Sequence, residues 1–407
     1  MTRQTTDILI SGGGVAGLTA AAAFGAAGFS VLCADPTPPV TEAEAAGADL
    51  RSTAFLQPAQ EVLRRAGLWD RLAPDAAALQ IMRIVDAGGP ADAMGRYAPR
   101  SIKDFDAAEI SDLPFGWNLP NWLLRREMVA RLAELPNVQF RPGTATTSLL
   151  TRENSALVGL GTGETVEARL VIAADGRNST MRQALGIPVK TLRYGQKALS
   201  FAVTHPIPHA NVSTEIHRSG GPFTLVPLPD RNGLPASAVV WMERGPEVQR
   251  LAALPVAAFE AAIALRSCHL FGPLTLTSLR SIWPIISQMA LRMTGERVAL
   301  IAEAAHVVPP IGAQGLNMSL ADLACLLDLA RKGNPAGLGG AAMLAAYARA
   351  RQPEVQARVL AVDALNRAAM AGTPLLRDLR AAAVSGLFAL APLRRGLMQA
   401  GLGLTRR

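Results

Sequence analysis

The stretch Asp7-Ile8-Leu9-Ile10-Ser11-Gly12-Gly13-Gly14-Val15-Ala16-Gly17, followed by an alanine-rich run, decides the fold of this 407-residue chain. Residues 8–11 form a short apolar run, which is typical of a strand buried on both faces. The next residues fit G-x-G-x-x-G, and residues 18–27 strongly favour a helix. Free N–H groups at the start of such a helix attract phosphates. The sequence therefore predicts a strand–turn–helix that holds the pyrophosphate of a dinucleotide at Gly12, Gly14, Ala16 and Gly17.

The second predicted strand, residues 29–34, ends at Asp35, which follows Gly17 by 18 positions. An acidic residue at this distance binds a ribose hydroxyl. Because a carboxylate repels a 2′-phosphate, the site favours FAD or NAD over NADP. One alternative is a glycine-rich turn without a ligand. Another is a membrane span or signal peptide over the uncharged residues 8–34, but the many glycines and the missing basic region before them argue against it.

Composition excludes several classes of protein. The three cysteines, Cys33, Cys268 and Cys325, form no C-x-x-C, which excludes a disulfide framework and a cysteine zinc site, and the five histidines show no metal spacing. The net charge of +8 favours an acidic partner, and because no nucleic-acid motif accompanies it we expect anionic lipid or anionic cofactors. A base-composition bias of the source genome is the alternative. We expect a cytoplasmic protein, with peripheral contact to the inner face of the membrane as a further expectation.

The middle of the chain changes character. Residues 190–280 consist of short alternating runs between Pro and Gly turns, which predict an antiparallel sheet inserted in the first domain. Residues 298–302 again form a buried strand, and from Tyr347 onward the pattern is helical.

Two further motifs carry a resemblance to a known family. The first is Asp175-Gly176-x-x-Ser179-x-x-Arg182, and the second runs from Val298 through Glu303 and His306 to Pro310-Ile311-Gly312-Ala313-Gln314-Gly315-Leu316-Asn317, with a later Asp322. Together with the glycine turn, they resemble the class A flavoprotein monooxygenases, the group that includes p-hydroxybenzoate hydroxylase. The second motif is similar to the ring hydroxylases of ubiquinone biosynthesis. The resemblance covers nearly the whole chain, and the three motifs are specific jointly.

The resemblance implies an α/β fold with a discontinuous Rossmann-like FAD-binding domain, an inserted antiparallel-sheet substrate domain and C-terminal helices. We assign residues 1–78, 119–184 and 279–346 to the FAD-binding domain, residues 79–118 and 185–278 to the substrate domain, and residues 347–407 to the C-terminal helical region.

The resemblance also implies which residues hold FAD. Asp175-Gly176 would lie near the pyrophosphate and the path of NADPH, Arg51 and Arg125 would reach FAD, Gly315 and Asn317 would contact the isoalloxazine, and Pro310 would lie beside the ring. The residues themselves support part of this, because small residues before a helix let backbone N–H groups stabilise negative charge on a reduced flavin. The alternative for Asp175 is a capped turn, and Arg182 either pairs with Asp175 or faces solvent. The alternative for Arg51 and Arg125 is that they are solvated surface arginines. For His306 we favour a structural role over that of a catalytic base.

The chain departs from the family pattern at Ala302-Glu303, where the family usually has Gly-Asp. That Asp bonds the ribityl chain of FAD, and Glu303 keeps the acceptor but adds a methylene. Ala302 adds a Cβ where backbone and cofactor approach closely, and Ala313 and Ser319 also replace glycines of the signature. Because no acceptor is lost, we expect that FAD still binds.

The implied chemistry uses NADPH or NADH to reduce FAD, after which O2 supplies one oxygen atom to an activated phenol ring. The cofactor carries this chemistry, so we expect no side-chain nucleophile. The substrate should lie between the antiparallel sheet and the flavin. Candidates to line it are Phe201, Phe223, Trp117 and Pro310, although each is more often simply core.

The sequence of the C-terminal region gives information about the kind of substrate. Residues 377–407 carry six Arg and one Asp among leucines at helical spacing. This pattern fits an interfacial helix that docks on anionic lipid and takes a polyprenyl phenol from the bilayer, or equally a helix packed on the core. The leading interpretation is an FAD monooxygenase of ubiquinone biosynthesis.

Three alternatives remain beside it. In the first, the fold is the same but the substrate is a soluble aromatic compound. In the second, the protein binds FAD but is a halogenase or an isoprenoid reductase. Residues 117–122 do not fit the halogenase pattern W-x-W-x-I-P. The third is a non-catalytic accessory protein of a quinone-synthesis complex. Fold analogy alone does not fix the substrate.

Overall fold

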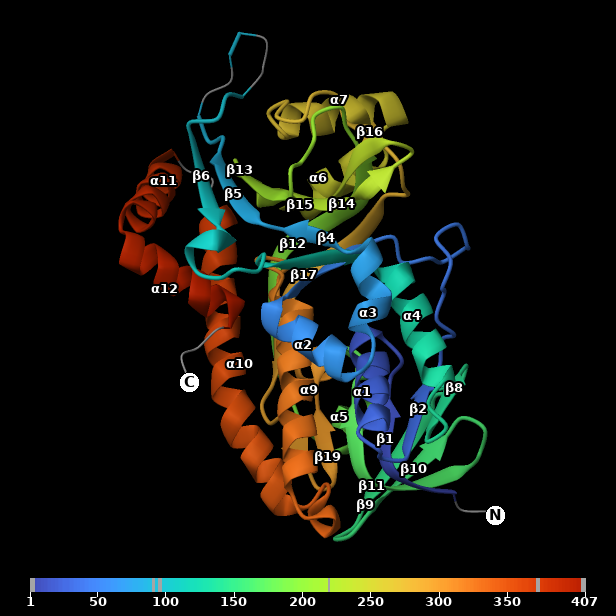
Figure 1. Ribbon diagram of the computed structural model, residues 1–407. Coiled ribbons are helices and arrows are strands. Elements are labelled where there is room, and N and C mark those ends of the chain that lie inside the picture. The colour runs from blue at the N-terminus through green and yellow to red at the C-terminus, as the bar shows by residue number, and fades with distance from the viewer. Residues whose placement is uncertain (1–3, 90–91, 94–96, 219, 371–373, 404–407) are drawn as a thin grey trace.

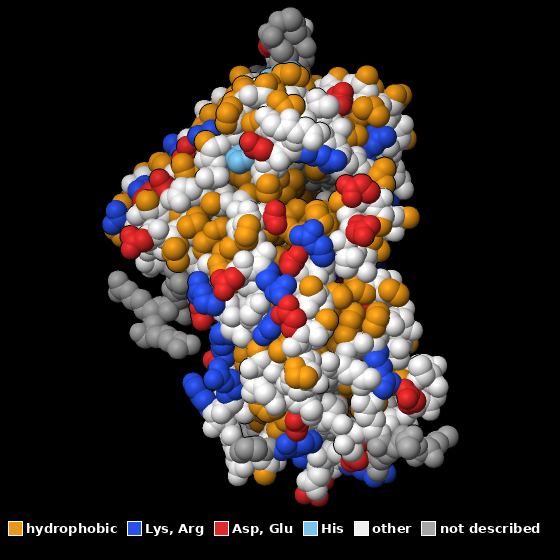
Figure 2. Space-filling model, turned by 45° about the vertical axis from the view of Figure 1, so that its right-hand side comes forward, with side chains coloured by type: hydrophobic (Ala, Val, Ile, Leu, Met, Phe, Trp, Pro, Cys, Tyr) orange, Lys and Arg blue, Asp and Glu red, His pale blue; other side chains and the backbone are white. Residues whose placement is uncertain are grey.

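The protein consists of two bodies, each built on a large sheet, with helices of the C-terminal region along one side (Figure 1). The computed structural model describes residues 4–89, 92–93, 97–218, 220–370 and 374–403. On the face shown in Figure 2, exposed apolar side chains gather in patches on both halves of the molecule, while charged side chains crowd together across its middle.

The first sheet has a parallel centre, as the glycine motif predicts. Its strands lie in the order β18-β19-β11-β1-β2-β8, and β10 and β9 extend it from β11. β1 pairs in parallel with β11 and with β2, so the two strands that flank the glycine turn are neighbours. The bounds are β1 Gln4–Ser11, β2 Val31–Asp35, β8 Val138–Pro142, β9 Thr146–Thr151, β10 Ala156–Leu160, β11 Thr165–Ala173, β18 Thr294–Gly295 and β19 Val298–Leu300.

Helices cover this sheet and bury one large apolar core with it. β1 and α1 are almost fully buried, which explains why residues 8–34 carry no charge. Figure 1 shows α1, α4 and α9 side by side in the lower body. The helices are α1 Val15–Ala26, α2 Gln57–Arg65, α3 Trp69–Leu72, α4 Asn121–Ala133, α5 Thr180–Ala184, α8 Ala302–Ala305 and α9 Gln314–Lys332.

The second sheet is antiparallel except for one pair, β5 with β13, which is parallel. Its order is β20-β17-β12-β15-β14-β13-β5-β6, and β16 pairs with β12. The bounds are β5 Ile81–Asp86, β6 Ser101–Asp106, β12 Val189–Thr204, β13 Val212–His217, β14 Pro222–Arg231, β15 Leu234–Arg244, β16 Thr275–Leu276, β17 Ser281–Ala290 and β20 His306–Val307.

The return to the first domain comes later than the boundary at residue 279 implies. β17 belongs to the second sheet, because it forms a long antiparallel ladder with β12, from Val189 opposite Ala290 to Ser200 opposite Ser281. The first sheet resumes only at β18. A strand of alternating residues shows no sign of which sheet it joins, so the sequence placed it wrongly.

The two faces of the second sheet meet different partners. One face packs on α6 (Gly245–Ala252) and α7 (Val256–Arg266), in a core that contains Phe201 and Phe223. The other face forms a smaller apolar cluster, Ala198, Met242, Ile285, Ile311 and Val362. This second cluster joins the sheet to the loop before α9 and to α10.

A small third sheet and the C-terminal helices complete the fold. β3 (Ser52–Leu56), β7 (Gly116–Pro120) and β4 (Ala77–Leu79) form the small sheet, in the order β3-β7-β4. The C-terminal helices are α10 (Ala341–Met370), α11 (Pro374–Ala389) and α12 (Ala391–Leu402), and 3₁₀ turns occupy Ala73–Asp75, Ala107–Glu109 and Pro335–Gly337. In the described part of the chain, no helix is both long enough and apolar enough to cross a membrane.

Candidate cofactor and active site

The glycine turn between β1 and α1 is held by close packing. Gly12 has φ +107°, and a Cβ there would lie 2.4 Å from the carbonyl oxygen of Ala174. A Cβ on Gly17 would lie 1.9 Å from the carbonyl oxygen of Gly12. At Gly14, by contrast, a Cβ would meet no atom of the described residues within 4 Å. Gly12 and Gly17 therefore shape the turn, and Gly14 leaves its backbone open to a ligand.

The carboxylate of Asp35 braces the same turn. It accepts hydrogen bonds from the N–H of Gly13 at 2.5 Å and from the N–H of Thr37 at 2.7 Å. A carboxylate has about four acceptor positions, so it can still accept a ribose hydroxyl. Ala16 is buried in the first turn of α1, and no described side chain caps this helix. The free N–H groups of that turn are therefore available to an anion.

Asp175 lies directly beside the turn, since Gly12 packs against Ala174 and Asp175. Its Oδ2 accepts the N–H of Met181 at 3.1 Å, whereas its Oδ1 is buried and has no partner among the described residues. Gly176 follows with φ +79°. The capped turn is thus real, but it uses only half of the carboxylate, and an unsatisfied buried acceptor calls for a donor.

Arg182 neither pairs with Asp175 nor faces solvent, contrary to both sequence interpretations. It is buried and donates to the carbonyl oxygens of Ala304 at 2.9 Å and of Arg177 at 2.8 Å. Burial lowers the pKa of Arg182 from its usual value. The side chain thereby fastens the Asp175-Gly176 turn to α8.

The departure at Ala302-Glu303 has a clear backbone signature. Ala302 has φ +54°, a left-handed conformation that glycine adopts without cost, and Ala313 has φ +55°. Both alanines therefore hold a backbone conformation that is usual for glycine. The side chain of Glu303 is half-exposed, and its Oε2 lies 3.3 Å from Nε of Arg177.

Arg51 and Arg125 converge on one carboxylate, Asp49. Arg51 donates two hydrogen bonds to Asp49, at 2.8 and 2.7 Å, and its guanidinium lies 4.0 Å from the ring centroid of Trp283. Arg125 reaches Asp49 at 3.4 Å. Burial raises the pKa of Asp49, but the hydrogen bonds from Arg51 outweigh it and hold the pKa below the usual value.

The charge of Glu303 acts on the same arginine. Burial would lower the pKa of Arg51, but its bonds to Asp49 and the charge of Glu303 raise that pKa above the usual value. The side chain of Arg51 is 39% exposed, but Asp49 and Trp283 hold it in place. The sequence analysis did not name Asp49 or Trp283. Asp49 stands two residues before Arg51, and this spacing was a signal for Asp49 but not for Trp283.

The loop before α9 lies between the two bodies. Ile311 packs into the apolar cluster on the second sheet, Pro310 is exposed, and Gly312 has φ +62°. α9 begins at Gln314 without a side-chain cap among the described residues, so the N–H groups near Gly315 are free to meet a ligand.

Asn317 ties this loop to the small sheet. Its Oδ1 accepts the N–H of Leu56 at 2.8 Å, and its Nδ2 donates to the carbonyl oxygens of Ala54 at 2.8 Å and of Ala313 at 2.6 Å. Both donors of the amide are used inside the protein. If this residue contacts a flavin, the contact would therefore be made mainly by its backbone atoms.

His306 belongs to a buried network. Its Nε2 lies 2.6 Å from Oδ2 of Asp322, and Oδ1 of the same carboxylate accepts from Nε of Arg351 at 2.8 Å. Nδ1 of His306 is buried and has no partner among the described atoms. This placement agrees with the structural role that the sequence favours.

The aromatic residues expected to line the substrate site do not gather around it. Phe201 packs on Phe259 with ring centroids 5.0 Å apart, and Phe223 packs on Trp241 at 5.4 Å, both on the α6–α7 side of the second sheet. Trp117 packs edge-on against Trp69 at 5.0 Å. Of the four candidates only Pro310 lies in the loop beside the other face.

The face of the second sheet that meets the loop before α9 carries apolar residues that the sequence analysis did not name. Because strand residues alternate, Ala198 points to the side opposite Leu199 and Phe201. Tyr194, Val240, Met242 and Ile285 join it in the apolar cluster around Ile311. The alternation of side chains along the strands predicts two sheet faces, but it does not predict which face meets the loop before α9.

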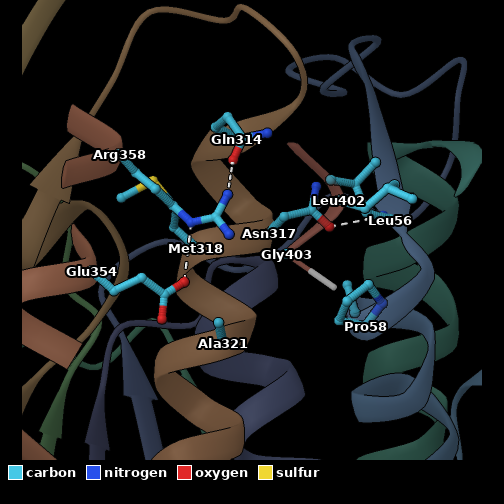
Figure 3. A pocket seen from close by; sticks show the side chains of 11 residues that line it. Leu56, Pro58, Gln314, Asn317, Met318, Ala321, Glu354, Arg358, Leu402 and Gly403 are labelled. Atoms are coloured by element: carbon cyan, nitrogen blue, oxygen red, sulfur yellow. Dashed lines mark hydrogen bonds and ion pairs between the residues drawn. The ribbon is translucent and has the colours of Figure 1, made fainter. Parts of the chain in front are cut away.

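A cavity of about 60 Å³ lies next to the start of α9. Figure 3 shows Gln314, Arg358 and Glu354 along one wall, with Leu56, Pro58 and Leu402 across from them. Gln314 accepts from Arg358 at 2.7 Å and donates to the carbonyl oxygen of Gly401 at 3.2 Å. The end of α12 therefore forms part of the cavity wall.

These features suit FAD. Gly14 leaves an open backbone, the start of α1 offers N–H groups for a pyrophosphate, and Oδ1 of Asp175 is an acceptor in need of a donor. The described residues contain no group of three or more His, Cys, Asp or Glu that could hold a metal ion.

Comparison with known proteins agrees with this chemistry. The family described as "FAD binding domain" matches residues 5–361. The chain is 32% identical over 402 residues to ubiquinone hydroxylase UbiL of Rhodospirillum rubrum, covering 98% of this chain and 90% of that protein. It is 28% identical to 3-demethoxyubiquinol 3-hydroxylase of Escherichia coli, covering 81% of this chain and 80% of the relative.

Solved structures agree on the fold. p-Nitrophenol 4-monooxygenase PnpA of Pseudomonas putida superposes with a TM-score of 0.77 at 19% identity, covering 99% of this chain and all of that one. PqsL of Pseudomonas aeruginosa superposes with a TM-score of 0.74 at 22% identity, covering 90% and 97%.

The fold and the site define a flavoprotein with a dinucleotide-binding body and a second sheet that packs on the loop before α9. The chain belongs to the FAD-binding domain family. It is an FAD-dependent monooxygenase that uses NAD(P)H as electron donor, as the class A resemblance implies.

Proposed function

We propose that this enzyme hydroxylates the aromatic ring of a polyprenyl phenol in ubiquinone biosynthesis, with NAD(P)H and O2 as cosubstrates. The observation that carries the proposal is the similarity to a ubiquinone hydroxylase over 98% of this chain. The apolar cluster around Ile311 supports it, because an aromatic ring requires such a lining.

The roles of the site residues follow from their positions. The start of α1, with Gly12, Gly14, Ala16 and Gly17, would hold the FAD pyrophosphate, and Asp35 would accept a ribose hydroxyl. FAD, when bound, supplies the reduction by NAD(P)H and the activation of O2. The remaining contacts are assigned to Arg51, Arg125, Asp175, Gly176, Glu303, Pro310, Gly315 and Asn317.

The protein's part in the reaction is to position and to shield. Arg51 is held in one orientation by Asp49 and Trp283, so it can meet an anionic group without first ordering its side chain. The free N–H groups at the start of α9 would stabilise negative charge on the reduced ring. The apolar cluster excludes water from the reacting carbon.

A polyprenyl substrate would keep the enzyme at a membrane. We therefore propose a peripheral position on the inner face of the membrane, where a quinone-synthesis complex could also assemble. The net charge of +8 supports contact with anionic lipid.

Mass spectrometry of quinone intermediates in cells lacking this gene tests the proposal. Loss of ubiquinone, together with a prenylated ring short of one or more hydroxyls, is the expected result. Restoration by the wild-type gene but not by an FAD-free variant would exclude an accessory role. An unchanged quinone pool would count against this substrate and in favour of a soluble aromatic compound.

A further inference from the structure

The helices α11 and α12 expose an unusually apolar surface. Residues 381–393 contain no charged side chain. Along and just beyond this stretch, five leucines are between 37% and 59% exposed. We call this surface the leucine face; it consists of Leu379, Leu387, Leu390, Leu393 and Leu397. Soluble proteins rarely leave a continuous apolar patch without a partner.

The helical spacing places the leucines of α12 on its outer side. In α12, the buried Met398 and Leu402 follow Arg394 at steps of four, and Leu393 and Leu397 form the next row, which is exposed. Figure 1 shows α11 and α12 at the edge of the molecule, beside β6 and away from the first sheet.

The leucine face remains exposed although the helices are firmly docked. Arg394 donates to Glu109 at 3.0 and 2.7 Å. Phe388 packs edge-on against Phe105 of β6, with ring centroids 5.4 Å apart. Arg100 pairs with Asp378 at 2.6 Å. The exposure is therefore a property of the folded helices and does not result from their detachment.

Cations lie next to the leucines. The side chain of Arg395 in α12 is 57% exposed and lies 3.7 Å from Glu109. Lys103 lies over the ring of Phe388. In sequence, residues 377–407 carry six Arg and one Asp. An apolar row bordered by cations complements acyl chains beneath anionic headgroups.

We propose that the leucine face docks on the surface of an anionic lipid bilayer. The inference rests on the proposed function, because a polyprenyl substrate resides in that bilayer. It adds the surface that makes the contact. The end of α12 bonds to Gln314 through the carbonyl oxygen of Gly401, so a docked α12 would hold the start of α9 close to the membrane.

Co-sedimentation of the FAD-loaded full-length protein with lipid vesicles tests the docking. We expect binding to phosphatidylcholine vesicles that contain phosphatidylglycerol, and much weaker binding to phosphatidylcholine alone. The double variant Leu393→Gln, Leu397→Gln should lower the partition coefficient by about tenfold or more. The matched control Leu150→Gln changes a leucine on β9 that is 55% exposed, and should bind as the wild type does.

Three results would overturn the proposal. These are no sedimentation of the wild type with either vesicle, equal sedimentation with both, and undiminished binding of the double variant. A concentration-dependent dimer that the double variant abolishes, without vesicle binding, would instead assign the leucine face to a second copy. Flavin content and the unfolding midpoint show whether each variant is folded. Because vesicle binding needs no turnover, its failure is distinguishable from failure of the proposed reaction.

Discussion

Oδ1 of Asn317 accepts a hydrogen bond from the N–H of Leu56 at 2.8 Å, although 261 positions separate the two residues in the chain. The amide nitrogen of Asn317 donates to the carbonyl oxygen of Ala54, so both strand atoms are held by a single side chain. Through this amide, the start of α9 and the strand β3 form one unit.

The variant Asn317→Asp tests this connection. An aspartate cannot donate to Ala54 and Ala313, so two carbonyl oxygens lose a partner, and the free energy of unfolding should fall by about 2 kcal/mol. Urea denaturation measures this. The control Asn154→Asp, in an exposed loop, should change stability by no more than about 0.5 kcal/mol. Equal effects of both variants would show that the Asn317 bonds contribute nothing.

Arg51→Lys should weaken FAD binding. A lysine cannot bond both oxygens of Asp49, and it lacks the planar group that lies over Trp283, so its charge is no longer held in place. The dissociation constant for FAD should rise by about tenfold, or about 1.4 kcal/mol. Titration of the apoprotein, followed by flavin fluorescence, measures it. Arg64→Lys, at an exposed pair with Glu61, is the control and should leave FAD binding unchanged. Normal affinity of Arg51→Lys would remove Arg51 from the cofactor site.

Ala302→Gly and Ala313→Gly should each stabilise the protein. Both alanines have a left-handed backbone conformation, which costs an L-residue about 1–2 kcal/mol. Glycine removes this cost, but its greater freedom in the unfolded chain lowers the free energy of unfolding by about 0.4–1 kcal/mol. The net gain in free energy of unfolding should be about 0.5–1 kcal/mol. Ala261→Gly, on the exposed side of α7, should instead lose about 1 kcal/mol. If all three variants lose stability alike, the left-handed backbone carries no strain.

Cys325 should resist alkylation. Burial raises the pKa of its thiol to about 11, whereas an unfolded cysteine titrates near ~8.5. Because only the thiolate reacts, iodoacetamide at pH 8.5 should modify Cys325 roughly a hundredfold more slowly in native protein than in urea, as followed by mass spectrometry. The raised pKa also means that stability from this group is intact below pH ~8.5 and is lost as pH rises toward 11, since the unfolded state ionises first. Equal native and unfolded rates would contradict the burial.

Local patterns predicted the parts of the fold that short segments determine. The β1–turn–α1 unit follows from packing between neighbouring residues, since a Cβ on Gly17 would lie 1.9 Å from the carbonyl oxygen of Gly12. Asp175-Gly176 was found from the family motif, and its contact with Gly12, more than 160 positions away, has no local signal in the sequence. The left-handed positions 302 and 313 were also visible as replaced glycines.

Partners distant in the chain could not be predicted. Trp283 reaches Arg51 from the second sheet, and Arg351 reaches Asp322 from α10, and neither has a local signal. The faces of the second sheet were misjudged, because alternation shows that Phe201 and Ala198 point apart but not which partner each meets. β17 was assigned to the wrong sheet for the same reason.

The paired strands β12 and β17 have a mechanical consequence. They are two of the segments that link the second sheet to the first body, beside the excursion through β5 and β6, and a ladder of backbone hydrogen bonds joins them along most of their length. Such a two-stranded ribbon resists sliding, because sliding breaks every rung at once, but it twists at little cost. Of these links, the ribbon therefore favours rotation of the two bodies over sliding, and such a rotation would change the space above Pro310 while the rungs stay paired.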